Sequence, residues 1–91
     1  MTTIPPDEAA VAAEFEDFLQ AQFPATAAGV DRDVDLFDAG VIDSVGVAET
    51  IAFLEDRYGV EIPDDLLLSD DFTTIAGIAR SIVHLTAGAR T

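Results

Sequence analysis

Three aspartates, Asp31, Asp33 and Asp35, lie at every second position of the chain, a spacing that could begin a calcium-binding loop. Such a loop also needs a glycine at its sixth position and a bidentate glutamate at its twelfth. Counted from Asp31, these positions hold Leu36 and Ile42. The chain has no cysteine and one histidine, so no other pattern indicates a metal site. We therefore predict that the protein binds no metal ion of its own.

Ser44 and His84 could in principle serve as nucleophile and base of a hydrolase triad, with one of the many acidic residues as the third member. The sequence around Ser44 lacks the G-x-S-x-G turn in which such a serine is often mounted. His84 follows Ile82 and Val83 in an amphipathic segment, where a lone histidine usually lies at the surface. We therefore predict no catalytic residue and no autonomous catalysis.

The pair Asp43-Ser44 offers a different chemistry. A serine at the start of a helix is usually only a cap, but here the preceding aspartate can already serve as the cap. The serine also closes an unusually long loop and precedes a helix whose exposed face is acidic. An exposed hydroxyl at the positive end of a helix dipole is a suitable place for a covalently attached phosphate. Ser44 is therefore our candidate modification site, and its acidic surroundings would attract a basic partner.

Apolar spacing predicts the elements that must position this site. A helix over residues 6–22 is predicted from apolar side chains with a helical period, namely Val11, Phe15, Phe18 and Leu19. Pro24 ends this helix. Residues 24–43 show no sustained period, so we expect a long loop, and long loops in small domains are often functional. Its expected core anchors are Leu36 and Phe37, with Val41 and Ile42 as further candidates.

A second helix is expected from Ser44 to Tyr58, ending at Gly59, which can adopt the left-handed conformation that closes many helices. Its predicted core face holds Val47, Ile51, Leu54 and Tyr58. Its opposite face holds Val45, Glu49, Ala52 and Asp56, with Ser44 and Glu55 at the border. Residues 63–68 can form a short helical turn, and Thr73 or Thr74 can cap a last helix that ends near residues 86–88.

No segment alternates in the manner of a strand. We therefore predict an all-α bundle of three to four helices with one long loop after the first helix. The 91 residues are too few for a second core, so we expect a single domain over residues 1–91, with an ordered core over about residues 6–87.

The chain carries 18 acidic residues against four arginines and no lysine, which gives a net charge of −14 and a pI near 4.1. Nucleic acid and anionic membranes repel such a polyanion, so we expect neither as a partner. Thirteen of the acids lie within residues 31–71, around Ser44, which favours partners with basic patches. The N-terminus lacks the features of a signal peptide and no apolar run is long enough to cross a membrane, so we expect a cytoplasmic protein. Charge repulsion favours a monomer.

The run Asp35-Leu36-Phe37-Asp38-Ala39-Gly40-Val41-Ile42-Asp43-Ser44-Val45 resembles the attachment-site signature of acyl and peptidyl carrier proteins. That signature has a Leu-Phe pair, a glycine, and then Asp-Ser followed by Leu, Met, Ile or Val. Residues like those of the family's second helix and its exit follow at Glu49, Ile51, Leu54, Glu55, Tyr58, Gly59, Ile62 and Pro63. Thr73-Thr74-Ile75 resembles the opening of its last helix. The resemblance covers about residues 7–86; Asp-Ser alone is a weak signal, and the combination is specific.

This resemblance implies a helical bundle of the acyl-carrier type. It also implies that Ser44 carries a 4′-phosphopantetheine arm, transferred from coenzyme A by a magnesium-dependent phosphopantetheinyl transferase, and that Asp43 helps to orient the site. Acyl or aminoacyl groups would be held as thioesters on the thiol of the arm. The protein would then be a non-catalytic carrier whose partners are that transferase and an acyl- or aminoacyl-loading ligase, an acyltransferase or a synthase with a basic docking patch.

Six residues on the side of the second helix that Ser44 can reach form the predicted docking surface for these partners: Val45, Ala48, Glu49, Ala52, Glu55 and Asp56. Their acids would meet arginines or lysines of partner enzymes and act mainly on encounter rate and partner choice. Each acid could equally be a solvating charge. Phe53 is either a helix–helix contact or an exposed recognition residue. Gly46 lowers helix stability, and it could loosen the first turn or permit close approach of a partner.

Several functions remain open. Ile42 before Asp-Ser, and Val45-Gly46 after it, favour a discrete carrier of a specialised pathway, of the polyketide or nonribosomal peptide type, including carriers loaded by amino-acid-activating ligases. One alternative is the acyl carrier of fatty-acid synthesis. Another, of a different class, is an acidic helical interaction module that keeps the carrier fold and is never modified. A calcium-responsive bundle is disfavoured by the failed loop spacing.

Overall fold

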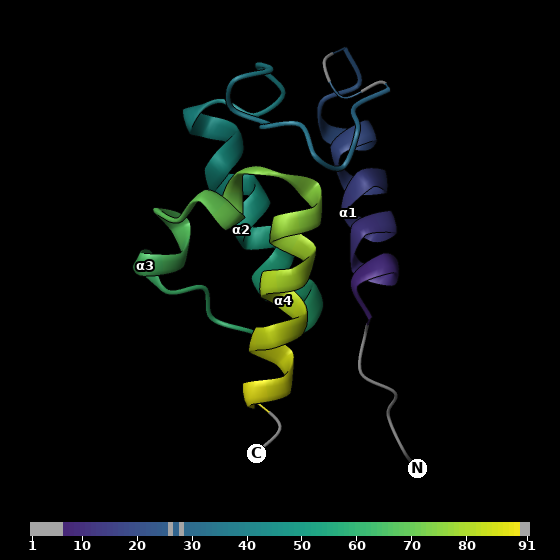
Figure 1. Ribbon diagram of the computed structural model, residues 1–91. Coiled ribbons are helices and arrows are strands. Elements are labelled where there is room, and N and C mark those ends of the chain that lie inside the picture. Colours follow the sequence, from purple (N-terminus) through teal and green to yellow (C-terminus); the bar gives the residue numbers. More distant parts are fainter. Residues whose placement is uncertain (1–6, 26, 28, 90–91) are drawn as a thin grey trace.

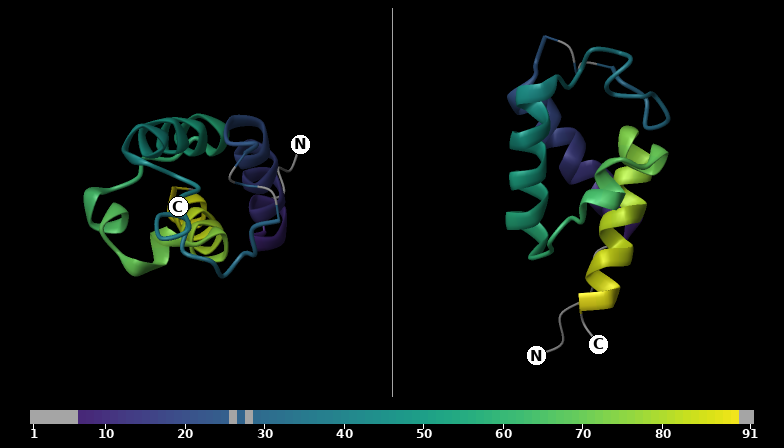
Figure 2. Two further views of the ribbon diagram at one scale, coloured as in Figure 1. Left: turned by 90° about the horizontal axis from the view of Figure 1, so that it is seen from above. Right: turned by 90° about the vertical axis from the view of Figure 1, so that its left-hand side faces the viewer.

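Four α-helices and one short 3₁₀ helix make up the regular structure of the described chain. The computed structural model describes residues 7–25, 27 and 29–89, and within these ranges it contains no strand. In chain order the elements are α1 (Glu8–Gln22), α2 (Ser44–Tyr58), α3 (Asp64–Leu67), the 3₁₀ helix η1 (Asp70–Thr73) and α4 (Ile75–Ala89) (Figure 1). Seen from above, α4 lies between the other helices (Figure 2). The predicted all-α bundle with a long loop after its first helix is confirmed.

The first helix begins at Glu8, because the Asp7 carboxylate caps it by accepting a hydrogen bond from the Ala10 N–H at 2.7 Å. The sequence placed its start at residue 6, which lies outside the described residues. The apolar stripe is confirmed, since Val11, Phe15 and Leu19 are buried and Phe18 is half-buried. This stripe packs mainly against α4.

The last helix provides the other half of this core. Its apolar face is buried through Ile75, Ile78, Ala79 and Ile82. Of the two threonines that could cap it, Thr74 does so, because its hydroxyl oxygen accepts a hydrogen bond from the Gly77 N–H at 2.9 Å. The residues that precede α4 form η1.

The long loop between α1 and α2 is tied to the start of α4. The Leu36 N–H donates to the Thr73 carbonyl at 2.7 Å, and the Ala76 N–H donates to the Arg32 carbonyl at 2.9 Å. Arg32 also pairs with Glu16 of α1 at 2.9 Å. These bonds hold the loop against the bundle at both of the helices that form its core.

Three of the four expected loop anchors are buried and one is not. Leu36, Val41 and Ile42 lie in the core, whereas Phe37 is 42% exposed, so its predicted burial is wrong. The reason is a local turn: the Asp35 carboxylate accepts hydrogen bonds from the Phe37 and Asp38 N–H groups at 2.9 and 3.0 Å. That turn directs Leu36 inward and leaves its neighbour outside.

The second helix has the predicted bounds, and Gly59 ends it in the left-handed conformation with φ of 65°. Its core face is rotated from the prediction. Leu54 is buried as expected, but the other fully buried positions are Gly46 and Thr50. The remaining predicted core residues are half-buried, namely Val47, Ile51 and Tyr58.

Side chains of α1 cause this rotation. Phe53 stacks on Phe18 with ring centroids 4.2 Å apart, which confirms Phe53 as a helix–helix contact. At the C-terminal end of α2, Glu14 accepts hydrogen bonds from the Tyr58 hydroxyl and from Arg57. The second helix is therefore held against α1 by long side chains rather than by close approach of the two backbones.

Candidate functional site

Ser44 is the first residue of α2, and its side chain is exposed. The helix cap is the preceding residue, because the Asp43 carboxylate accepts a hydrogen bond from the Gly46 N–H at 2.8 Å. Within the described part of the chain, the Ser44 hydroxyl has no hydrogen-bonding partner. The structure thus confirms that Asp43 caps the helix and that the Ser44 hydroxyl is not used as the cap.

The loop anchors fix where this serine emerges. The N–H groups of Val41 and Ile42 donate to the Leu36 carbonyl at 2.9 and 3.2 Å, and all three side chains are buried. Asp43 and Ser44 follow directly and are both exposed. The chain thus passes from a fixed core anchor to an exposed hydroxyl within two residues, which presents the hydroxyl from a rigid base.

The electrostatics of this position suit an attached phosphate. The N-terminal end of a helix carries partial positive charge on its unpaired N–H groups, and no acidic residue occupies the first turn of α2. The Asp43 carboxylate satisfies one of these N–H groups. Chemically, the arrangement is an accessible hydroxyl at a helix end with a carboxylate beside it, which suits covalent modification from outside.

The predicted docking residues lie on one exposed face of α2, with one exception. Val45 is 71% exposed, and Ala48, Glu49, Ala52 and Asp56 are exposed as well. Glu55 is half-buried, and its carboxylate accepts a hydrogen bond from the Ile62 N–H at 2.9 Å, which secures the chain after α2. One carboxylate oxygen of Glu55 is therefore already engaged within the protein.

Gly46 has an internal reason to be glycine. A Cβ atom at this position would lie 2.9 Å from the Phe23 ring carbon Cζ and 3.3 Å from the Asp43 carboxylate. The close approach that the missing side chain permits is therefore that of Phe23, within the same chain. Neither a loosened first turn nor a partner is needed to account for this residue.

A small cavity lies behind α2, and the sequence did not predict it. It has a volume of about 40 Å³ and is lined by Phe37, Ile42, Val47, Thr50, Ile51, Leu67, Phe72 and Ile78. The Thr50 hydroxyl is buried and has no partner within the described residues. The sequence does indicate that Thr50 is buried, because Thr50 lies four residues before the buried Leu54 on the same side of a helix.

The other candidate groups of the sequence do not gather at Ser44. Within residues 7–25, 27 and 29–89, no cluster of three or more His, Asp or Glu side chains could hold a metal ion. His84 is exposed on α4, where it lines a groove beside Ser81 and Leu85. None of the helices in the described part of the chain is long and apolar enough to span a membrane.

Comparison with known proteins gives two findings. A protein-family model described as "Phosphopantetheine attachment site" matches residues 9–82. A D-alanyl carrier protein of Streptococcus pyogenes serotype M5 (strain Manfredo) is 40% identical over 53 residues, which are 58% of this chain and 67% of that protein. A D-alanyl carrier protein of Streptococcus sanguinis (strain SK36) is 42% identical over the same shares.

Proposed function

Since the chain belongs to the family of carrier proteins with a phosphopantetheine attachment site, we propose that Ser44 is its point of attachment and that it carries aminoacyl groups. Members of this family are non-catalytic and bear a covalent 4′-phosphopantetheine group. When attached, the group supplies a thiol on which cargo is held as a thioester. The observation that carries the proposal is the exposed Ser44 hydroxyl, which has no hydrogen-bonding partner in the described chain.

The residues around Ser44 fit this group. The hydroxyl is accessible, and Val45 beside it is exposed, so the start of α2 leaves room for a bulky substituent. The Asp43 carboxylate holds the first turn of α2 through the Gly46 N–H, so the helix start does not depend on the serine as a cap. We assign Asp43 a second role, in which its charge orients the site toward the magnesium-dependent transferase that modifies Ser44.

The cargo that the chain supports best is a small aminoacyl group. The relatives reported above are named for D-alanyl groups. The cavity behind α2 supports the same choice, because about 40 Å³ is little more than the space of one water molecule and one wall is the polar Thr50 hydroxyl. A fatty-acyl chain could enter this cavity only by parting its walls, whereas a small aminoacyl group needs no such opening. We include in this proposal that the protein serves a specialised biosynthetic pathway.

The partners are the phosphopantetheinyl transferase and an aminoacyl-loading ligase with basic docking patches. The exposed face of α2 offers them Glu49 and Asp56 beside the small apolar residues Val45, Ala48 and Ala52. Exposed ion pairs contribute only about 0–1 kcal/mol each, so these acids act mainly on encounter rate. The half-buried Glu55 contributes less to docking than its neighbours because Ile62 engages it.

The first test is the mass of the intact protein after incubation with coenzyme A, magnesium and a promiscuous phosphopantetheinyl transferase. We expect a gain of one phosphopantetheine, which Ser44→Ala abolishes and Ser81→Ala leaves unchanged. Ser81 is a suitable control because its hydroxyl already donates to the Gly77 carbonyl at 2.8 Å. A folded protein that gains no mass with an active transferase would instead support the unmodified interaction module.

The second test concerns cargo. The modified protein is offered D-alanine and ATP with a D-alanine-activating ligase, and in parallel a fatty acid with an acyl-activating ligase. We expect a thioester-linked aminoacyl group in the first reaction, which hydroxylamine removes. Efficient fatty-acyl loading without aminoacyl loading would contradict the proposed cargo and would favour the fatty-acid carrier.

A further inference from the structure

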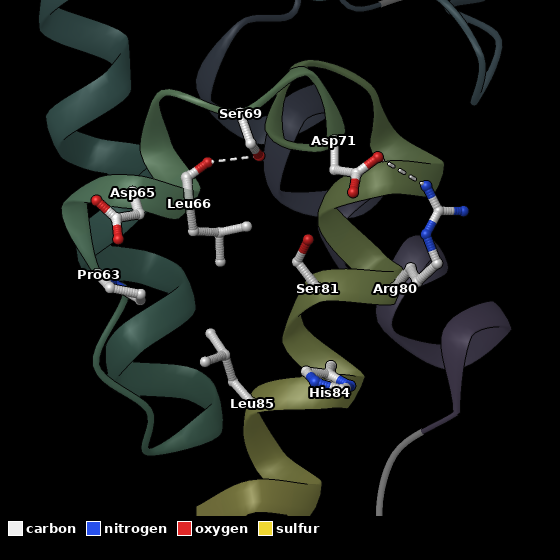
Figure 3. A pocket seen from close by; sticks show the side chains of 9 residues that line it. All are labelled: Pro63, Asp65, Leu66, Ser69, Asp71, Arg80, Ser81, His84 and Leu85. Carbon is white, nitrogen blue, oxygen red and sulfur yellow. Dashed lines mark hydrogen bonds and ion pairs between the residues drawn. The ribbon is translucent and has the colours of Figure 1, made fainter.

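A groove of about 620 Å³ opens between α3 and α4 (Figure 3). Leu66 projects into it from α3, and Leu85 projects from α4. The helix α2 lies behind these two walls (Figure 3), and no residue of α2 lines the groove. The groove is therefore separate from Ser44 and from the docking residues of α2.

The short helix α3, beside this groove, leaves apolar side-chain surface outside the core. Three successive leucines, Leu66, Leu67 and Leu68, lie in and after α3, and no residue of α3 is fully buried. Leu67 faces the small cavity behind α2, Leu66 is half-buried at the groove, and Leu68 is 86% exposed. Exposed apolar surface beside a groove is typical of interaction sites.

Charge indicates the kind of partner that would cover this surface. Asp65 and Asp71 lie at the rim of the groove, and we call them the rim carboxylates. Asp71 pairs with Arg80 at 3.3 Å, but both side chains are more than half exposed, so the pair is weak and an incoming cation can replace Arg80. Asp65 makes no ion pair with any described residue. The α4 side of the groove contributes Arg80 and His84 and no acid, so Asp65 is the carboxylate that first receives an incoming cation.

We propose that this groove is a second docking site, which binds a basic amphipathic segment of a partner protein. The segment inserts an aliphatic or aromatic side chain between Leu66 and Leu85 and sets an arginine or lysine against the rim carboxylates. A second copy of this chain is not the occupant, because two molecules with a net charge of −14 repel each other. A partner bound here leaves Ser44 free for another enzyme.

The test uses the full ¹⁵N-labelled chain and a synthetic peptide in which two leucines are flanked by arginines. A matched peptide has glutamates in place of the arginines. We expect saturable shifts of the amide signals of Leu66, Ser81 and Leu85 with the basic peptide, weakening as salt is added, and none with the acidic one. Shifts confined to α2, or no shifts at all, would overturn the proposal.

Three variants separate the groove from general charge attraction. Leu66→Ala removes the apolar wall and should weaken peptide binding about tenfold. Asp65→Asn removes a rim carboxylate and should weaken it severalfold. Asp17→Asn removes an equal charge from the exposed face of α1 and should leave binding unchanged. Equal losses for Asp65→Asn and Asp17→Asn would show unspecific attraction and refute the site.

The site does not depend on the attachment function, and one further variant keeps the two apart. Ser44→Ala abolishes the proposed attachment but should bind the basic peptide as the parent chain does. Loss of peptide binding in this variant would place the peptide at the start of α2 and overturn the second site. Far-UV circular dichroism checks the fold of Leu66→Ala. If Leu66→Ala unfolds, the peptide binding of Asp65→Asn tests the groove instead.

Discussion

The helices α2 and α4 begin with the same local design. In each, a side-chain oxygen caps the first turn by accepting a hydrogen bond from a glycine three residues later. Asp43 accepts from the Gly46 N–H at 2.8 Å, and Thr74 accepts from the Gly77 N–H at 2.9 Å. Local sequence therefore makes two similar helix starts.

Tertiary structure gives these two starts opposite roles. The residue after the cap is the exposed Ser44 in α2 and the buried Ile75, only 1% exposed, in α4. The start of α4 is enclosed by the long loop, whose Arg32 and Leu36 bond to residues 76 and 73. The first residue of α4 is part of the core, whereas the first residue of α2 leaves its hydroxyl exposed.

The two glycines show the same contrast. A Cβ atom at Gly77 would lie 1.9 Å from the Asp71 carbonyl oxygen, which belongs to the backbone and cannot easily move. A Cβ atom at Gly46 would meet the end of the Phe23 ring at 2.9 Å, and a half-buried side chain can shift. The start of α4, which we call the scaffold start, is therefore packed against backbone, whereas the start of α2 is packed against a side chain that can move.

The strongest way to break the scaffold start is Gly77→Ala. Because its Cβ atom cannot coexist with the present position of Asp71, we expect η1 to separate from α4 and the free energy of unfolding to fall by about 3 kcal/mol. Urea denaturation followed by circular dichroism measures this. A loss below about 1 kcal/mol would contradict the close packing at this start.

The next effect concerns the contact that joins α2 to the scaffold. Phe53→Ala removes the ring that stacks on Phe18, and we expect a loss of about 2 kcal/mol, since the side chain is half-buried. The control is Leu68→Ala, which removes a side chain that is 86% exposed and should cost less than about 0.5 kcal/mol. Equal losses for the two variants would mean that the stack does not hold α2.

The counterpart of the first prediction is Gly46→Ala. Alanine favours a helix over glycine by about 1 kcal/mol, and this gain offsets part of the cost of displacing Phe23. We expect the unfolding free energy to change by less than about 1 kcal/mol, while Gly77→Ala in the same urea series loses far more. If both alanine variants lost the same amount, the contrast between the two starts would be wrong.

The cap of α2 can be separated from its charge by Asp43→Asn. Asparagine caps helices about as well as aspartate, so we expect stability to change by less than about 0.5 kcal/mol. The rate of phosphopantetheine transfer should fall severalfold, because the carboxylate charge beside Ser44 is lost. Asp38→Asn, an exposed change in the loop, is the control and should leave the rate nearly unchanged. An undiminished rate in Asp43→Asn would leave Asp43 with its capping role alone.

The smallest effect concerns the far end of α2. The hydrogen bond from the Tyr58 hydroxyl, aided by Arg57, lowers the pKa of Glu14 below its ordinary value of 4.5. A carboxyl with a lowered pKa in the folded state stabilises the protein fully above pH 4.5 and loses this contribution as the pH falls further. Because the ion pair is partly exposed, the contribution should stay below about 1 kcal/mol.

Glu14→Gln isolates this contribution from the other carboxylates. The difference in unfolding free energy between the parent chain and Glu14→Gln should be present at neutral pH and shrink below pH 4.5. Urea denaturation of both proteins across that range measures it. A difference that stayed constant with pH would mean that the Glu14 charge does not stabilise the contact between α1 and α2.

Much of this molecule follows from its sequence because local signals and burial agree. The stripe of Val11, Phe15 and Leu19 predicts α1 and its core face. Asp43 and Gly59 mark both ends of α2 through cap chemistry and a left-handed turn. These are short-range effects, so neighbouring residues suffice to predict them.

The errors arise where a loop offers no periodicity or where a distant segment decides which face is buried. Phe37 is as apolar as Leu36, but the Asp35 turn points it outward, and periodicity carries no information about a loop. The core face of α2 is turned toward Gly46 and Thr50, where Phe23 comes close to Gly46, and Phe18 of α1 stacks on Phe53 of the same helix. The exposure of Ser44 could be predicted, and so could the burial of Thr50 on the side of Leu54. The small cavity behind α2 could not, because side chains from the loop, α3, η1 and α4 also line it.

The most direct test of the central claim is to locate the modification within the chain. Trypsin cleaves after Arg32, Arg57 and Arg80, so the three serines of the protein fall on three different peptides. Ser44 lies alone on residues 33–57, Ser69 on residues 58–80, and Ser81 beyond Arg80. After transfer from coenzyme A, we predict that the added mass lies on peptide 33–57 and on no other. An addition to either of the other serine peptides would contradict the assignment of Ser44 as the site that α2 presents.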